Sequence, residues 1–139
     1  MDKETNPKDA VGIKKVPMSC VSSPVVMEVA LGMMEGARKY GRHNYRIAGV
    51  RASVYYDASM RHLMDWWEGQ DIDPASGLSH VTKAITSLFV LRDAMLNEMW
   101  TDDRPPKHKN KEWIAEYNKK AGEIIEMYPD SKDPFTEIS

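Results

Sequence analysis

Residues 23–41, SPVVMEVALGMMEGARKYG, contain the helix signals on which the predicted fold class rests. Ser23 followed by Pro24 is a typical helix start, because a hydroxyl that can cap the helix precedes a proline at the first helical position. Apolar residues then recur every three or four positions, and Gly41 is a typical helix end. A helix over residues 24–40 is therefore predicted. Its buried face is expected to consist of Val26, Val29, Met33, Ala37 and Tyr40.

The same signals predict three further helices. They cover about residues 53–68, 74–99 and 112–128, and Asp73 before Pro74 repeats the start in which a cap precedes proline. Alternating apolar and polar residues, the mark of a half-buried strand, are rare along the chain. The predicted fold class is all-α, an antiparallel bundle of about four helices, because short connections favour antiparallel neighbours.

The predicted domain organisation is simple. Proline and glycine interrupt residues 1–23, which are interpreted as an extended N-terminal arm. Residues 24–128 would form a single helical catalytic domain, and residues 129–139 a C-terminal tail. The apolar stripes are wide and the chain has 10 Met and 4 Trp, so part of this surface is expected to be buried in a homo-oligomer.

Composition narrows the classes of function. The formal net charge is −2, so stable binding to nucleic acid is not expected and any anion site must be local. The single cysteine excludes an internal disulfide framework and a cysteine-based zinc site, and it fits a reducing compartment. No window approaches the roughly 18 apolar residues of a membrane span, and the N-terminus lacks the apolar core of a signal peptide. We therefore expect a cytoplasmic protein without membrane contact.

Two acidic residues flank the loop after the first predicted helix. Glu35 lies just before this loop and Asp57 just after it, so an antiparallel hairpin would bring the two carboxylates together. Carboxylates from facing helices are the minimal beginning of a divalent-metal site. The alternative is a surface ion pair of either acid with Arg61.

Two histidines flank the next turn at similar distances. His62 and His80 are each about eight or nine residues from residues 70–73, so they are expected to face one another. They are either packed core residues or groups with a catalytic or ligand role. Lys83, one turn beyond His80, would reach a phosphate or only water, and Asp73 would either cap a helix or line a site.

Four segments occur in a specific order: NPKDAVGIKKVP (6–17), EGARKYGRHNYR (35–46), GVRASVYYDASMRHLMDWWEGQDIDPASGLSHVTKA (49–84) and DDRPP (102–106). Together they resemble the phage dATP/dGTP diphosphohydrolase family of the MazZ type, which is related to the all-α MazG-like pyrophosphatases. The metal signature E-x-x-E…E-x-x-D of those relatives is missing, since Arg38 stands three residues after Glu35.

The resemblance implies an activity and its requirements. It implies conversion of dGTP or dATP, or both, to the nucleoside monophosphate and pyrophosphate, with Mg²⁺, Mn²⁺ or Co²⁺, by attack of metal-activated water on the α-phosphorus. The setting would be the nucleotide pool of a phage-infected cell or 2-aminoadenine metabolism, and the assembly a dimer or tetramer.

Site residues follow from the resemblance and from the helical positions together. The catalytic residues are expected to be Glu35, Asp57 and His62, with Glu35 and Asp57 also as metal ligands. The residues expected to bind substrate are Lys39, Asn44, Arg61, Asp73, His80 and Lys83.

Two other readings remain open from the sequence. One is a non-catalytic helical module of a phage that binds a nucleotide or a protein, which the missing metal signature favours. The other is a small nucleic-acid-binding protein that uses the basic loop of residues 38–51, against which the net charge argues.

Overall fold

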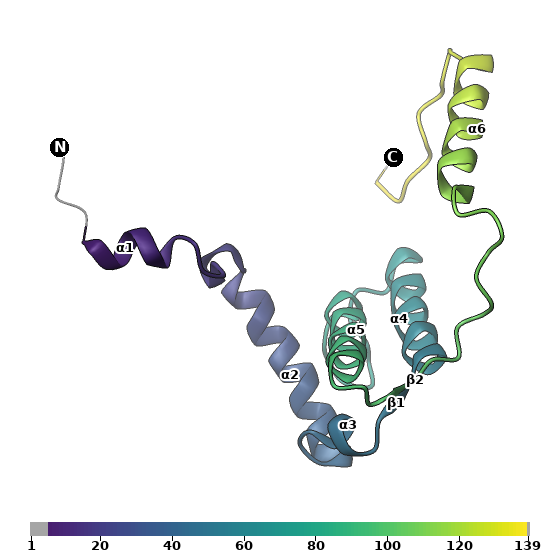
Figure 1. The fold of residues 1–139 in the computed structure, drawn as a ribbon. Coiled ribbons are helices and arrows are strands. Elements are labelled where there is room, and N and C mark those ends of the chain that lie inside the picture. The colour runs from purple at the N-terminus through teal and green to yellow at the C-terminus, as the bar shows by residue number, and fades with distance from the viewer. Residues whose placement is uncertain (1–5, 139) are drawn as a thin grey trace. The chain divides into compact units, whose positions relative to one another are not determined.

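The computed structural model describes residues 6–138, which divide into two compact units at the bond between Arg104 and Pro105 (Figure 1). Residues 1–5 of the predicted arm and residue 139 of the predicted tail lie outside the described residues. The all-α prediction is confirmed, since helices dominate and the described strands are a single short pair. The elements are α1 (Pro7–Gly12), a 3-10 turn (Met18–Cys20), α2 (Ser23–Tyr40), α3 (Asn44–Ile47), β1 (Val50–Arg51), α4 (Ala52–Trp67), α5 (His80–Leu96), β2 (Trp100–Thr101) and α6 (Trp113–Met127).

Helix α5 is the centre of the first unit, because it packs along α4 and also crosses α2 (Figure 1). The predicted hairpin of the first two long helices is therefore replaced by an arrangement in which α5 contacts both. The connecting loop explains the difference. It contains α3, which packs on α5 through two hydrogen bonds from Arg46 to the Asp93 carboxylate, of 3.0 and 2.9 Å. The chain thus runs over α5 before α4 begins.

The crossing of α2 and α5 depends on Gly32. A Cβ atom at this position would lie 2.5 Å from Thr86 Oγ1, so only glycine allows the present separation of the helices. Beside the crossing, Thr82 Oγ1 donates a hydrogen bond of 2.8 Å to Glu28 Oε1. This contact therefore uses small and polar residues rather than a stripe of large apolar ones.

The predicted apolar stripe of α2 is only partly buried. Val29 is buried and Met33 half-buried, whereas Val26 and Tyr40 are 49% and 71% exposed. The reason is that α2 meets α5 at one crossing, so the ends of the stripe find no partner in the same unit. Large apolar residues of α5 are exposed as well, among them Ile85, Leu88 and Phe89.

Helix α4 begins differently from the prediction. It starts at Ala52, one residue before the predicted start, so Ser53 lies inside its first turn. Both the backbone N–H (2.8 Å) and the hydroxyl of Ser53 donate hydrogen bonds to the carboxylate of Asp103. An acidic side chain from 50 residues further along the sequence thus satisfies a free N–H at the helix start.

The two described strands pair beside the start of α4. Val50 of β1 pairs with Trp100 of β2 in parallel. Gly49, just before β1, has a positive φ of 77°, and a Cβ there would lie 2.8 Å from the Met99 carbonyl oxygen. This strand pair and the Asp103–Ser53 contact together are called the clasp below. Strands of two residues are too short to leave a pattern in the sequence.

The third long helix also starts later than predicted. It begins at His80, where the Ser79 hydroxyl accepts a hydrogen bond from the Val81 N–H. Asp73 is therefore not its cap, and Pro74 is not its first residue. Residues 73–78 instead form a turn closed by a hydrogen bond of 2.8 Å from the Asp73 N–H to the Leu78 carbonyl.

The remaining helices lie towards the chain ends. Helix α6 agrees with the prediction for residues 112–128 within one residue at each end, and it belongs to the second unit. The predicted arm contains α1 and a 3-10 turn rather than extended chain throughout its described part. Across residues 6–138, none of the helices has the length and apolar character needed to cross a membrane.

Candidate active site

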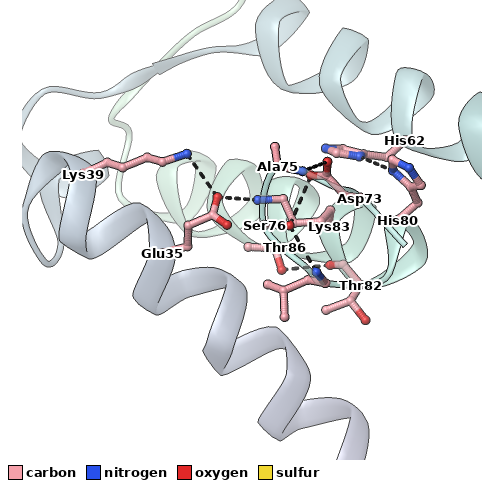
Figure 2. A network of polar contacts seen from close by, with 11 residues as sticks. Glu35, Lys39, His62, Asp73, Ala75, Ser76, His80, Thr82, Lys83 and Thr86 are labelled. Carbon is pink, nitrogen blue, oxygen red and sulfur yellow. Dashed lines mark hydrogen bonds and ion pairs between the residues drawn. The ribbon is translucent and has the colours of Figure 1, made fainter. Parts of the chain in front are cut away.

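Glu35 is held by two lysines near the end of α2. Its Oε1 atom accepts a hydrogen bond of 2.7 Å from Lys83 of α5 and one of 3.2 Å from Lys39, one turn further along α2 (Figure 2). The hydrogen bond from Lys83 is the main cause that lowers the pKa of Glu35, while burial opposes it. Glu35 is thus ionised at neutral pH, and both lysine contacts use one of its two oxygens.

Asp57 lies apart from this group. It is exposed on α4, and no hydrogen bond or ion pair of its side chain occurs within residues 6–138. The expected meeting of Glu35 and Asp57 is therefore not formed in one chain, because α5 separates the helices that carry them. The alternative ion pairs with Arg61 are not formed within the described chain either, and Arg61 is exposed.

The two histidines do face one another, as predicted from their spacing. His62 Nδ1 lies 2.8 Å from His80 Nδ1, across the contact between α4 and α5 (Figure 2). His80 is 2% exposed, and its Nε2 lies 2.6 Å from Gln70 Oε1. His80 is therefore buried behind His62, which is a poor position for direct contact with substrate. Burial, followed by the neighbouring His80, lowers the pKa of His62.

Asp73 organises the turn that precedes α5. Its carboxylate accepts hydrogen bonds from the Ala75 N–H (3.0 Å) and the Ser76 hydroxyl (3.2 Å) (Figure 2). Burial opposes the shift, but these two hydrogen bonds and the charges of the histidines lower the pKa of Asp73. The role observed for Asp73 is that of a turn cap whose negative charge acts on the histidine pair.

A cleft of about 840 Å³ lies beside Glu35, lined mainly by α2, α5 and the loop that contains α3. Four of the predicted site residues line it: Glu35, Lys39, Asn44 and Lys83. The other predicted residues do not: Asp57, Arg61, His62, Asp73 and His80. Lys83 relates the cleft to the histidine pair, because it bonds Glu35 and its charge also acts on His62.

The basic residues of the loop differ in what they bind. Asp93 binds Arg46 through both carboxylate oxygens, so this guanidinium serves the fold. Arg42 lines the cleft and has no acidic partner in the described part of the chain. Arg42 is therefore a candidate site residue that is not among those predicted to bind substrate. Its position in a segment rich in basic residues was the available signal.

Among residues 6–138, no group of three or more His, Cys, Asp or Glu side chains is arranged to hold a metal ion. A site built by one chain alone would therefore have fewer than three such ligands. Mg²⁺ does not require more, since it usually binds one or two carboxylates together with water and substrate phosphates. The free oxygen of Glu35 at the cleft fits this mode of binding.

Comparisons with known proteins identify relatives of the chain. The family model described as "dATP/dGTP diphosphohydrolase, N-terminal" matches residues 5–104, which is most of the chain. A dATP/dGTP diphosphohydrolase of Salmonella phage PMBT28 is 31% identical over 90 residues, which are 65% of this chain and 30% of that protein. The matched segment thus covers less than a third of the length of this relative. The search of solved structures found no significant match.

Proposed function

The chain belongs to the dATP/dGTP diphosphohydrolase family, because it matches the model of that family's N-terminal region. We therefore propose that it converts dGTP, dATP or both to the monophosphate and pyrophosphate. The observation that carries the proposal is the cleft, where a carboxylate and three cationic side chains meet: Lys39, Arg42 and Lys83. A triphosphate carries several negative charges, and the chain has no overall positive charge to attract it. A local cluster of cations supplies that attraction.

The cationic residues have defined tasks in this proposal. Lys83 and Lys39 bind phosphate oxygens as point charges, and Arg42 binds two oxygens at once through its planar guanidinium. Asn44 and the aromatic residues Tyr40 and Tyr45 lie at the same cleft and are suited to contact the nucleoside. Water attacks the α-phosphorus, a new P–O bond forms, and the bond to the β-phosphate oxygen breaks as pyrophosphate leaves.

Metal dependence is part of the proposal. Glu35 would hold Mg²⁺, Mn²⁺ or Co²⁺ through the oxygen that the lysines leave free, with substrate phosphates as further ligands. When bound, the cation supplies charge neutralisation and lowers the pKa of a coordinated water. Asp57 is exposed and unpaired in the described structure, which supports keeping it as a second candidate ligand.

We also propose that the working form is a homo-oligomer, a dimer or tetramer. The exposed apolar residues of α2 and α5 support this, for instance Val26, Leu31, Leu88 and Phe89. Large apolar side chains exposed in this number are often covered in an assembly. In an oligomer, a carboxylate from a second copy can complete a site that one chain builds only in part.

The test is pyrophosphate release from each dNTP with Mg²⁺, Mn²⁺ or Co²⁺. We expect dNMP and pyrophosphate from dGTP or dATP, and loss of activity by about 100-fold or more for Glu35→Gln, because the metal anchor is removed. Glu28→Gln is the matched control. Glu28 lies on the same helix but outside the cleft, so this variant should keep activity. Circular dichroism would verify that each variant retains its helices.

Each outcome separates the alternatives. Full activity of Glu35→Gln removes Glu35 from the site, and full activity of Asp57→Asn removes Asp57. Nucleotide binding without any turnover would indicate a non-catalytic module. Release of inorganic phosphate alone would indicate cleavage at a different bond.

A further inference from the structure

The geometry of the histidine pair determines which ring nitrogens carry protons. Two imidazole Nδ1 atoms at 2.8 Å must share one proton, so one ring donates and the other accepts. Which ring donates is decided by what binds the second nitrogen of each ring. This second nitrogen is Nε2 in both residues.

The partner of His80 Nε2 sets the direction of the pair. Gln70 Oε1 lies 2.6 Å from this nitrogen, and a carbonyl oxygen can only accept. The carboxylate of Asp65, at 3.9 Å, also favours a proton on His80 Nε2. His80 is then bare at Nδ1 when neutral, and His62 must donate from its own Nδ1.

This direction leaves His62 Nε2 without a proton and, among residues 6–138, without a protein partner. Within the described structure, no buried side-chain nitrogen or oxygen lacks a hydrogen-bond partner. His62 is half-buried and its Nε2 makes no hydrogen bond, so this atom must be accessible to solvent. An accessible, unprotonated imidazole nitrogen is a proton acceptor.

The groups around His62 favour its neutral form, although charged side chains lie near it. Burial and His80 lower the pKa of His62, and Lys83 acts in the same direction. The opposing charges come from Asp73 in the turn and from Asp65 on α4. Lys83 also bonds Glu35 at the cleft, so the cation that would bind phosphate is one whose charge also acts on the proton acceptor.

We propose that Gln70 and His80 are positioning residues, which hold His62 in the tautomer that carries its proton on Nδ1 and presents a bare Nε2 as the general base. This inference rests on the proposed hydrolysis and adds the group that takes the proton. Nε2 of His62 accepts the proton of the attacking water as the oxygen bonds to the α-phosphorus, and the electron pair of the broken bond leaves with pyrophosphate. His62 then releases the proton to solvent.

The tautomer itself can be tested without any turnover. Long-range ¹H–¹⁵N spectra of the full chain labelled at histidine distinguish protonated from bare ring nitrogens. The four histidines are assigned by single substitution. We expect a protonated Nδ1 for His62 and a protonated Nε2 for His80 near neutral pH. The opposite pattern, with the proton of His62 on Nε2, would overturn the proposal even if the chain hydrolyses dNTPs.

Substitutions at Gln70 then test the relay in the reaction. Gln70 is exposed, so its variants should fold. Gln70→Glu keeps an obligatory acceptor and should preserve the His62 tautomer and kcat, with the acidic limb of the pH profile moved to higher pH by the added charge. Gln70→Met removes the acceptor, so it should mix the tautomers and lower kcat by less than about tenfold, with KM unchanged. Equal profiles for wild type, Gln70→Glu and Gln70→Met would refute positioning by Gln70.

His62→Gln completes the test, with an expected loss of kcat of about 100-fold or more. Retained kcat in this variant would remove His62 as the base, whatever its tautomer. If wild type releases no pyrophosphate from any dNTP, the proposed function and the catalytic use of His62 fall together. The spectra would still decide whether Gln70 and His80 set the tautomer.

Discussion

Helix α5 contacts its two neighbours in different ways. It meets α2 at a single crossing, where Gly32 lies against Thr86 and the ion pair of Lys83 with Glu35 lies beside it. It lies along α4 over a longer contact, and α4 is held a second time by the clasp at its start. The position of α2 thus depends on one crossing, whereas that of α4 is secured twice. The difference predicts where substitutions will matter most.

The largest effect is expected at the crossing. Gly32→Ala places a methyl group 2.5 Å from Thr86 Oγ1, and overpacking of this kind costs about 1–3 kcal/mol. The better helix propensity of alanine, about 1 kcal/mol, offsets only part of this. The free energy of unfolding, measured by urea titration, should therefore decrease. Adding Thr86→Ala to Gly32→Ala should restore part of the loss, because it removes the atom in the way.

Gly36→Ala is the matched control for this prediction. It lies on the same helix, and a Cβ there would have no neighbour within 4 Å. This variant should be as stable as wild type or more stable by up to about 1 kcal/mol. Equal stability of Gly32→Ala and Gly36→Ala would contradict the close approach of α2 and α5.

An intermediate effect is expected from Lys83→Met, which should raise the pKa of Glu35. The hydrogen bond from Lys83 is the main cause of the lowered pKa. A lowered carboxyl pKa contributes stability above the pKa of the unfolded chain, and this is lost as pH falls towards the folded value. The free energy of unfolding of the variant should therefore be lower at neutral pH. It should also change less with pH in the acidic range. A carboxyl ¹³C titration measures the pKa.

Lys39→Met provides the comparison for Lys83→Met. Lys39 is more exposed than Lys83, and its hydrogen bond to Glu35 is longer, at 3.2 Å against 2.7 Å. The pKa of Glu35 should therefore rise less than in Lys83→Met. A larger rise for Lys39→Met would mean that the α2–α5 ion pair is not the main partner of Glu35.

The smallest effect is expected at the clasp. Asp103→Ala removes the acceptor for the Ser53 N–H and hydroxyl, and part of the stability at the start of α4 with it. Because α4 is also held along α5, the decrease in unfolding free energy should be smaller than for Gly32→Ala. Asp102→Ala is the control. Within the described residues, the carboxylate of Asp102 pairs only with Arg104, which lowers its pKa to about 2, and its loss should matter least. A larger loss of stability in Asp103→Ala than in Gly32→Ala would contradict this order of the two contacts.

The same difference explains what the sequence could predict. Local signals, such as Gly41 after an apolar period, predicted the helices of residues 24–40 and 112–128 closely. The facing of His62 and His80 followed from their equal distances to one short turn. These features depend on residues close together in the chain.

Other features were missed because they depend on residues far apart. The Glu35–Lys83 pair needs the crossing of α2 and α5, and the Asp103–Ser53 contact joins residues 50 positions apart. The start of α5 was misplaced because Asp73 and Pro74 also suit a turn, in which the side chain of Asp73 bonds the residues that follow. Local patterns do not distinguish these two uses of the same residues.

The clasp also bears on where the first compact unit ends. It closes the segment from Val50 to Asp103 into a loop whose two ends meet, and the family match ends one residue later, at 104. The compact first unit and the family match therefore end at the same residue. The clasp thus closes the contacts of α4 and α5 within the first unit, one residue before the family match ends.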